Sequence, residues 1–378
     1  MGQDDDEHQK PLSLRFESKR FWQDFRRELK VDQTGAAIIL DICGTPDEVS
    51  YSRTARHYDM PHRYRNPLYT WRRVVSQVDF LAELGLIEHD YRPPGLRGWQ
   101  SSIRATHELR RICAGIVGGA PLTLAMPAEV VLLRDDKGRL LDYRETRSID
   151  RMRRRLQRFN EAIMGSGIDD AIAAPLARIF NKDLTRGGRF YAMGASWQNV
   201  KAEARKSLTI GGEPVAELDY CTLHPAILYA EAGAAMPRDC YHLDGWPRKL
   251  VKVAMLTLIN AKTIHAARQS IAHNEMMSQW GEPGGQEALQ AADQLIKAIK
   301  RLHKPIAHAF HSDAGARLMA IDAALAETVM TIMLAQGVVV LPVHDSFIVQ
   351  ASKADELESA MLEAAHKAGF YALQVEAK

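Results

Sequence analysis

Two short apolar runs near the C-terminus constrain the fold of this 378-residue chain more than any other feature. Residues 338–343 and 347–349 are rich in β-branched side chains, and only His344, Asp345 and Ser346 separate them. Such runs are typical of buried strands, and so short a connection allows only a tight hairpin. The pattern therefore predicts two antiparallel core strands with an aspartate at the tip of their turn.

A second aspartate, Asp219, ends another predicted buried strand, and Pro225 lies near the start of the helix expected to follow it. Taken alone, each aspartate is more often a cap or a turn residue than a ligand. Two buried strands that each end in one aspartate can, however, bring both carboxylates to one sheet edge. A pair of this kind can hold two Mg²⁺ ions for phosphoryl transfer.

A basic pair lies between these aspartates in the sequence. Arg248 and Lys252 are four residues apart in a segment that predicts a helix, so they share one of its faces. By itself such a pair is an ordinary surface feature. Beside a metal-bound triphosphate, two cations would neutralise the β- and γ-phosphates.

The C-terminal half alternates predicted strands and helices, which indicates an α+β domain. We expect strands near 214–219, 338–350 and 370–376, and helices near 247–275, 286–309, 315–336 and 354–368. Before this domain, a linker region at 119–186 predicts a hairpin turning at 136–138 and a basic amphipathic helix at 149–163. One face of that helix carries five arginines: Arg151, Arg153, Arg154, Arg155 and Arg158. We expect this face, including Arg154, to contact a polyanion.

The N-terminal third concentrates positive charge, although the formal net charge of the whole chain is only +2. Between Arg53 and Arg111 there are 11 arginines and 6 acidic residues. A helix at 21–29 that ends near Gly35, a helix after Thr70, two strands around a Pro-Pro-Gly turn and a further helix predict a winged-helix-like domain at 17–118. We expect its basic face, with Arg97 on the wing, to bind duplex DNA. A face that is merely solvated is the competing interpretation.

Composition excludes several classes of protein. The four cysteines are scattered without a CxxC pair, which argues against a disulfide framework or a zinc ribbon and suits a reducing cytoplasm. We find no apolar run of the ~18 residues that span a bilayer, and the acidic N-terminus does not resemble a signal peptide. We therefore expect a cytoplasmic protein without a membrane partner, and a disordered tail at residues 1–16.

Four motifs resemble, in order, those of the family A nucleic-acid polymerases, which include the single-subunit RNA polymerases. GGRFYAMGASWQNV at 187–200 is similar to the Gly-Arg motif upstream of motif A, and DYCTLHPAIL is similar to motif A itself. Arg248-x3-Lys252 with Asn260 is similar to the motif B helix, and HDS at 344–346 is similar to motif C. Motif A is also similar to the SLYP form of the family B polymerases. The resemblance covers roughly the C-terminal half of the chain.

The resemblance implies a right-hand polymerase palm with abbreviated fingers at 187–378. The basic helix at 149–163 would then be a small, thumb-like element against the duplex. Asp219, Asp345 and the carbonyl of Tyr220 would hold two Mg²⁺ ions, with Mn²⁺ as the alternative. Arg248 would clamp the γ-phosphate, and Lys252 would neutralise or protonate the leaving pyrophosphate.

The resemblance also implies contacts with the nucleotide and with DNA. His224 and Asn260 fall at the nucleotide site, where neither is the residue typical of the family, so that dNTP and rNTP use both stay open. Arg189 would contact the duplex backbone, His344 would hold the primer end, and Gln198 would contact DNA.

Three hypotheses follow. The first is a monomeric template-directed DNA polymerase, a nucleotidyltransferase that adds dNTPs to the 3′-OH of a primer-template. It would lack proofreading, because the N-terminal third is too short and too rich in arginine for an exonuclease domain. The second is a primase or small RNA polymerase on the same palm. The third is a non-catalytic replication or regulatory DNA-binding protein, against which the presence of both aspartates, Arg248 and Lys252 counts.

Overall fold

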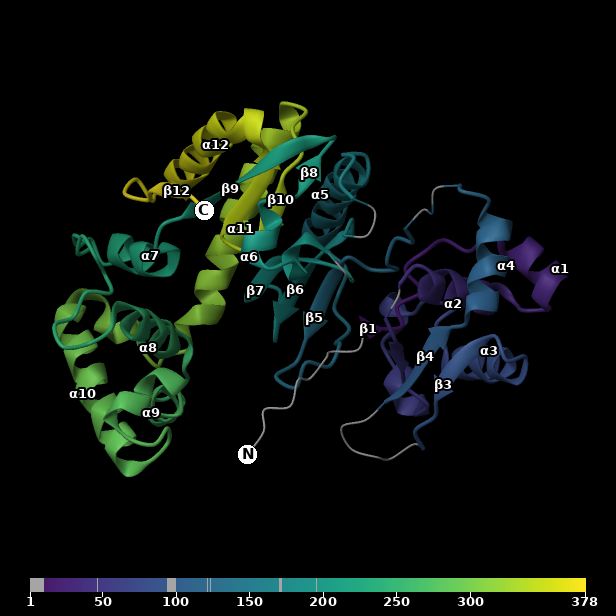
Figure 1. The fold of residues 1–378 in the computed structure, drawn as a ribbon. Helices are drawn as coiled ribbons and strands as arrows, with labels where there is room; N and C mark the ends of the chain where they lie inside the picture. The colour runs from purple at the N-terminus through teal and green to yellow at the C-terminus, as the bar shows by residue number, and fades with distance from the viewer. Residues whose placement is uncertain are drawn as a thin grey trace. The chain divides into compact units, whose positions relative to one another are not determined.

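The structure, a computed structural model, describes residues 10–45, 47–93, 100–120, 122, 124–169, 172–194 and 196–378. The chain divides into two compact units. Unit 1 comprises Met1–Val130 and Leu140–Arg144, and unit 2 comprises Val131–Arg139 and Glu145–Lys378. Each unit contains helices and sheet (Figure 1), which confirms a mixed α and β fold.

Unit 1 is built on a four-stranded sheet with the strand order β1-β2-β4-β3. The β1–β2 pair is parallel and the other two pairs are antiparallel. The strands are β1 (Lys10–Pro11), β2 (Val49–Tyr51), β3 (Ile87–Asp90) and β4 (Ser101–Ala105). The helices are α1 (Trp22–Leu29), α2 (Gln33–Cys43), α3 (Trp71–Glu83) and α4 (His107–Val117). The helix, strand pair and helix predicted after Thr70 are confirmed, whereas Arg97 lies outside the described residues.

Two expectations for unit 1 are wrong. The first helix ends at Lys30, whose φ of 62° is left-handed, and Gly35 lies in the first turn of α2 instead of ending α1. The expected disordered tail does not extend to residue 16, because Leu12, Leu14 and Phe16 are buried in the core of unit 1. The alternation of apolar residues at these three positions is the sequence signal of that short extended segment.

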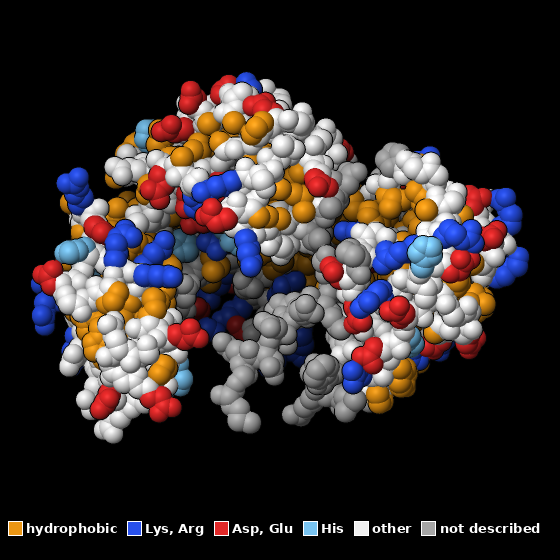
Figure 2. Space-filling model, viewed as in Figure 1, with side chains coloured by type: hydrophobic (Ala, Val, Ile, Leu, Met, Phe, Trp, Pro, Cys, Tyr) orange, Lys and Arg blue, Asp and Glu red, His pale blue; other side chains and the backbone are white. Residues whose placement is uncertain are grey.

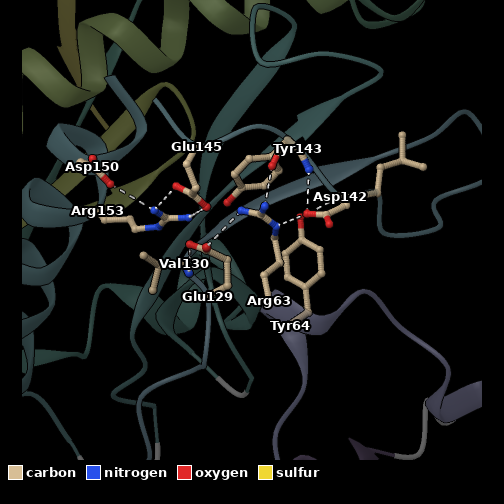
Figure 3. A network of polar contacts seen from close by, with 10 residues as sticks. Arg63, Tyr64, Glu129, Val130, Asp142, Tyr143, Glu145, Asp150 and Arg153 are labelled. Carbon is tan, nitrogen blue, oxygen red and sulfur yellow. Dashed lines mark hydrogen bonds and ion pairs between the residues drawn. The ribbon is translucent and has the colours of Figure 1, made fainter. Parts of the chain in front are cut away.

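The segment Leu140–Arg144 is held in unit 1 by a 3₁₀ helix at His62–Tyr64 (Figure 3). Arg63 donates from Nε to Oδ1 of Asp142 at 2.5 Å and also binds the Tyr143 carbonyl. Its guanidinium lies 3.7 Å from the centroid of the Tyr143 ring. The hydroxyl of Tyr64 donates to the carbonyl of Leu141 at 2.9 Å. Arg63 is therefore fully engaged in holding this segment.

Unit 2 contains two sheets. The larger has the order β10-β11-β9-β12, with β8 also paired to β9, and all its pairs are antiparallel. The smaller has the order β5-β6-β7. The strands are β5 (Val131–Arg134), β6 (Leu176–Asn181), β7 (Gly187–Ala192), β8 (Thr209–Ile210), β9 (Glu213–Tyr220), β10 (Leu341–Val343), β11 (Ser346–Gln350) and β12 (Val375–Ala377).

The helices of unit 2 largely follow the predicted positions. They are α5 (Arg147–Met164), α6 (Ala202–Arg205), α7 (Leu223–Glu231), α8 (Arg248–Asn260), α9 (Ile264–Ala272), α10 (Gln286–Leu302), α11 (Ala314–Ala335) and α12 (Ala354–Lys367). The single helix predicted over 247–275 is two helices, because Thr263 caps α9 by accepting a hydrogen bond from the Ala266 N–H at 3.1 Å.

The hairpin predicted to turn at 136–138 is only partly right. The turn exists, since the Asp135 N–H donates to the Arg139 carbonyl at 2.9 Å. However, β5 pairs in parallel with β6, and β6 pairs with β7. The sequence prediction missed β6 and β7, which lie where a linker and the start of a palm were expected.

In the part of the chain that the structure describes, α11 alone is long and apolar enough to cross a membrane by length and composition. Its sequence includes charged residues, which is why no uninterrupted apolar run was found there. The helix packs against β7, α8 and α12, and it carries the buried Asp322. Its apolar character thus matches its place in the core of unit 2.

Candidate active site

Asp219 lies on a strand of the larger sheet of unit 2, and Asp345 lies in the turn that leads into the neighbouring strand. Asp219 is the penultimate residue of β9 and lies opposite Ser346 of β11. Asp345 and His344 form the two-residue turn between β10 and β11, which confirms the predicted hairpin. The N–H of Tyr220 donates to the carbonyl of Asp345 at 3.3 Å. Pairing of β11 with β9 therefore brings together two aspartates that are far apart in the sequence.

The carboxylate of Asp219 has an environment that favours a bound cation. Burial raises its pKa, the charge of Asp345 raises it further, and Lys378 opposes both. Lys378 Nζ lies 2.8 Å from Oδ2, whereas Oδ1 is buried without a hydrogen-bond partner. The side chain of Asp345 makes no hydrogen bond or ion pair with any residue that the structure describes. A divalent cation would supply the partner that these carboxylate oxygens lack.

The chemistry of these two carboxylates suits Mg²⁺ better than a transition metal, which prefers imidazole or thiolate ligands. Among the described residues, no group of three or more His, Cys, Asp and Glu side chains could hold a metal. Two carboxylates without such a cage suit Mg²⁺, which keeps several waters and binds one or two carboxylates together with substrate phosphates. The residues present thus fit the metal that the sequence analysis expected.

Glu217 supports the pair, and the sequence analysis missed it. It shares a face of β9 with Asp219, two residues away. Arg205 donates to both its oxygens at 2.8 and 2.9 Å, and Ser346 Oγ donates to it at 2.7 Å. Although burial acts to raise the pKa of Glu217, these partners lower it. The bond from Ser346 joins Glu217 of β9 to β11. Because both carboxylate oxygens of Glu217 already accept hydrogen bonds, we do not assign it as a metal ligand.

Arg189 of β7 lies in a buried ion pair with Asp322 of α11. The Nε–Oδ2 distance is 2.5 Å, and the side chains are 15% and 2% exposed. Arg189 also lies 3.5 Å from Nε2 of His224, at the second position of α7. Burial and the charge of Arg189 lower the pKa of His224 to about 4, so this imidazole is neutral at pH 7. Arg189, predicted to contact the duplex backbone, is thus placed where it positions His224.

His344 and Gln198, both predicted to contact DNA, differ in whether their side-chain polar atoms already have hydrogen-bond partners. The ring of His344 meets Tyr191 edge-on at 5.5 Å between centroids, and its Nδ1 is buried without a partner. Gln198 accepts from the Ala192 N–H at 3.0 Å and donates to the Pro342 carbonyl at 2.8 Å. Its amide thereby links β7 to β10, so the structure gives Gln198 a structural role.

Arg248 and Lys252 both lie over the ring of Tyr241, which is buried. The guanidinium of Arg248 is 5.3 Å and Nζ of Lys252 is 5.8 Å from the ring centroid. Burial raises the pKa of Tyr241 to about 12, and the neighbouring Cys240 adds to this rise while Arg248 opposes it. Figure 2 shows Lys and Arg side chains gathered between α7 and α8.

These two cations differ in their partners. Arg248 donates from Nε to Asp239 at 2.8 Å and is 61% exposed. Lys252 is exposed and has no ion-pair partner among the residues described. Lys252 is therefore the cation available to a ligand without breaking a bond.

Asn260 and Arg154 are not joined to the aspartates by any contact between described residues. Asn260 is the last residue of α8, donates to the Leu256 carbonyl at 2.8 Å and lies against Gly315 of α11. It lines a hollow between α8 and α9 with residues such as Thr257 and Ser270. Arg154 is an exposed side chain of α5.

No protein-family model and no curated protein matches the chain. Among solved structures, it is similar to the POL domain of Pol1 from M. smegmatis, in complex with DNA primer-template and dNTP. The alignment covers 65% of this chain and 56% of that chain, at 16% identity and a TM-score of 0.32. So distant a likeness leaves the geometry of the site as the basis for any functional conclusion.

Proposed function

We propose that this protein is a template-directed nucleic-acid polymerase whose catalytic carboxylates are Asp219 and Asp345. The observation that carries the proposal is their juxtaposition at the end of the larger sheet, with Oδ1 of Asp219 buried and unpartnered. A buried carboxylate oxygen without a partner is costly and is retained where a ligand satisfies it. Arg248 and Lys252 on α8 would supply the cations that a bound polyphosphate needs.

Asp219 and Asp345, with the backbone carbonyl of Tyr220, would hold two Mg²⁺ or Mn²⁺ ions. Bound Mg²⁺ would lower the pKa of a primer 3′-OH and neutralise a triphosphate. Glu217 and Arg205 keep the end of β9 in register with β11, so that both carboxylates keep their separation. Lys378 compensates the charge of Asp219 in the structure, at 2.8 Å.

The triphosphate would lie on the side of α8 that Arg248 and Lys252 present. Lys252, which has no acidic partner among the described residues, would neutralise or protonate the leaving pyrophosphate. Arg248 would exchange its bond with Asp239 for one with the γ-phosphate, since an exposed ion pair stabilises the protein only slightly. The ring of Tyr241 would keep both cations close to each other.

The neutral imidazole of His224 would meet the nucleotide sugar, held in place by Arg189. A neutral His carries one hydrogen-bond donor and one acceptor, so it is compatible with either a deoxyribose or a ribose. In this proposal the larger sheet with α11 and α12 is the palm, α8 to α10 are short fingers, and α5 with Arg154 is the thumb. Unit 1 is a winged-helix-like nucleic-acid-binding module.

The test is single-nucleotide incorporation on a primer-template with Mg²⁺, run with dNTPs and rNTPs side by side. A DNA polymerase extends with dNTPs, whereas faster extension with rNTPs assigns the protein to the RNA-synthesising alternative. Binding of the primer-template without extension by either set of nucleotides would refute the polymerase proposal in favour of a non-catalytic DNA-binding protein.

A further inference from the structure

Most arginines of unit 1 already have partners. Arg104 pairs with Glu48 at 3.0 Å and with Glu88 at 3.6 Å, and Arg92 pairs with Asp90 at 2.8 Å. Arg15, Arg27, Arg53, Arg63, Arg110 and Arg111 also bind acidic residues or backbone carbonyls. The described strands on either side of the predicted wing therefore carry arginines that are already paired, while the wing itself, with Arg97, lies outside the described residues.

One hollow, at the N-terminal end of α3, is lined by two arginines that have no ion pair among the described residues. Arg65 and Arg72 line it, and neither forms an ion pair with any described residue. Arg65 donates from Nε to the Met60 carbonyl at 2.9 Å, which leaves its other donors available. Arg56, on the adjoining 3₁₀ helix at Ala55–Tyr58, is also exposed and without an ion pair among these residues. Asp59 supplies the one negative charge in the lining.

Aromatic rings line the same hollow. Trp71 is 39% exposed, although tryptophan is highly buried on average. Its Nε1 donates to the Arg53 carbonyl at 2.8 Å, which fixes the orientation of the indole ring. Tyr58 and Tyr69 lie beside it, with 5.1 Å between their ring centroids. A fixed, exposed indole near unpaired guanidinium groups is a platform for a nucleobase with its phosphates.

We propose that this hollow binds single-stranded nucleic acid, with an unpaired base against Trp71 and the flanking phosphates on Arg65 and Arg72. A duplex fits it less well, because paired bases stack on one another and cannot offer a face to the indole. The inference concerns unit 1 and does not depend on the activity proposed for unit 2. It also explains why the segment 51–69 is rich in Arg, His and Tyr.

The test uses the full chain without Mg²⁺ or nucleotides, so that its outcome is independent of polymerase activity. Fluorescence anisotropy would measure the affinity for a labelled oligo-dT and for a hairpin duplex, over a range of salt concentrations. Trp71→Ala should weaken oligo-dT binding at least about fivefold, since one stacked base contributes roughly 1–3 kcal/mol. Trp71→Phe should retain most of the affinity, because a phenyl ring can still stack.

Arg72→Ala supplies a second variant that changes an exposed side chain and so preserves the fold. It should reduce the log–log salt slope for oligo-dT by about 0.7, the value for one phosphate contact in a single strand. Arg104→Ala is the matched control, because it removes an arginine of the same unit that is already paired. It should change neither the affinity nor the slope.

Photocrosslinking with a 5-iodouracil oligonucleotide, followed by peptide mapping, locates the bound base directly. The expected crosslink falls on the peptide that contains Trp71. Wild-type affinity in both Trp71→Ala and Arg72→Ala would overturn the proposal, as would crosslinks confined to unit 2. Equal losses of affinity for the duplex and for the single strand would show that the hollow does not distinguish the two, and would also overturn the proposal.

Discussion

The stability of unit 2 should be sensitive to loss of the buried ion pair between Arg189 and Asp322. Asp322→Ala removes a carboxylate that is 2% exposed and leaves a guanidinium that is 15% exposed without its 2.5 Å partner. Breaking a buried pair in this way costs about 3–5 kcal/mol, because the remaining charge stays desolvated. For a unit of roughly 240 residues, this corresponds to a fall in Tm of about 6–20 °C.

Chemical denaturation of the full chain, followed by a probe in unit 2, measures this loss. Glu363→Ala is the control, since it breaks the exposed i,i+4 pair with Lys367 and should cost under about 0.5 kcal/mol. The double variant Arg189→Met/Asp322→Leu should recover most of the stability, because neither charge then remains buried. If Asp322→Ala costs no more than the control, the pair is not desolvated and the reasoning fails.

The same pair predicts a pH dependence with a definite sign. Burial raises the pKa of Asp322 to about 6; Arg189 opposes this rise, and Asp345 and Asp219 add to it. A carboxyl whose pKa is higher in the folded state holds its proton more tightly there. Its contribution to the free energy of unfolding therefore falls as the pH rises from about 4 to about 6. Asp322→Asn should remove this slope, and an unchanged slope would contradict the assignment.

Three further predictions concern other residues. Lys252→Ala should lower the rate of nucleotide addition about 100-fold or more without weakening primer-template binding; a variant that loses DNA affinity but keeps its rate would contradict the role given to Lys252. Lys378→Met should lower the Mg²⁺ concentration for half-maximal activity about two- to fivefold, because it removes the ammonium that competes at Asp219; an increased Mg²⁺ requirement would oppose this. Asn160→Ala should cost about 2–4 kcal/mol in denaturation experiments, because this buried amide binds both the N–H and the carbonyl of Leu176; the exposed Gln157→Ala is its control, and equal costs would refute the argument.

The strands that carry the candidate site could be predicted because each bears a local signal. The β-branched runs around His344 and Asp345 admit little besides a buried hairpin, and the apolar segment before Asp219 ends at a helix start. The pairing of β11 with β9 was not predictable from such local signals, because it joins segments that are distant in the sequence. The register of Asp219 against Ser346, which makes the pair a site, comes from the structure.

The hydrogen-bond and ion-pair partners of side chains could not be predicted from the sequence either. A motif places Arg189 and Gln198 near the site, but only the fold shows that Arg189 binds the distant Asp322 and that Gln198 is saturated by backbone groups. Likewise, the sequence counts 11 arginines between 53 and 111, yet their pairing decides which of them can meet a ligand. The β5–β6–β7 sheet was missed because its parallel pair joins segments separated by α5.

The central claim is that Asp219 and Asp345 form one catalytic carboxylate pair, and Mg²⁺-dependent primer extension by isosteric variants tests it most directly. Asp219→Asn and Asp345→Asn keep the shape of each side chain, so DNA binding and the unfolding transition should stay close to wild type. The account predicts that each variant loses nucleotide addition, while Asp355→Asn, which changes an exposed acidic residue in the first turn of α12, retains most of it. Extension at near wild-type rate by either Asp219→Asn or Asp345→Asn would contradict the account.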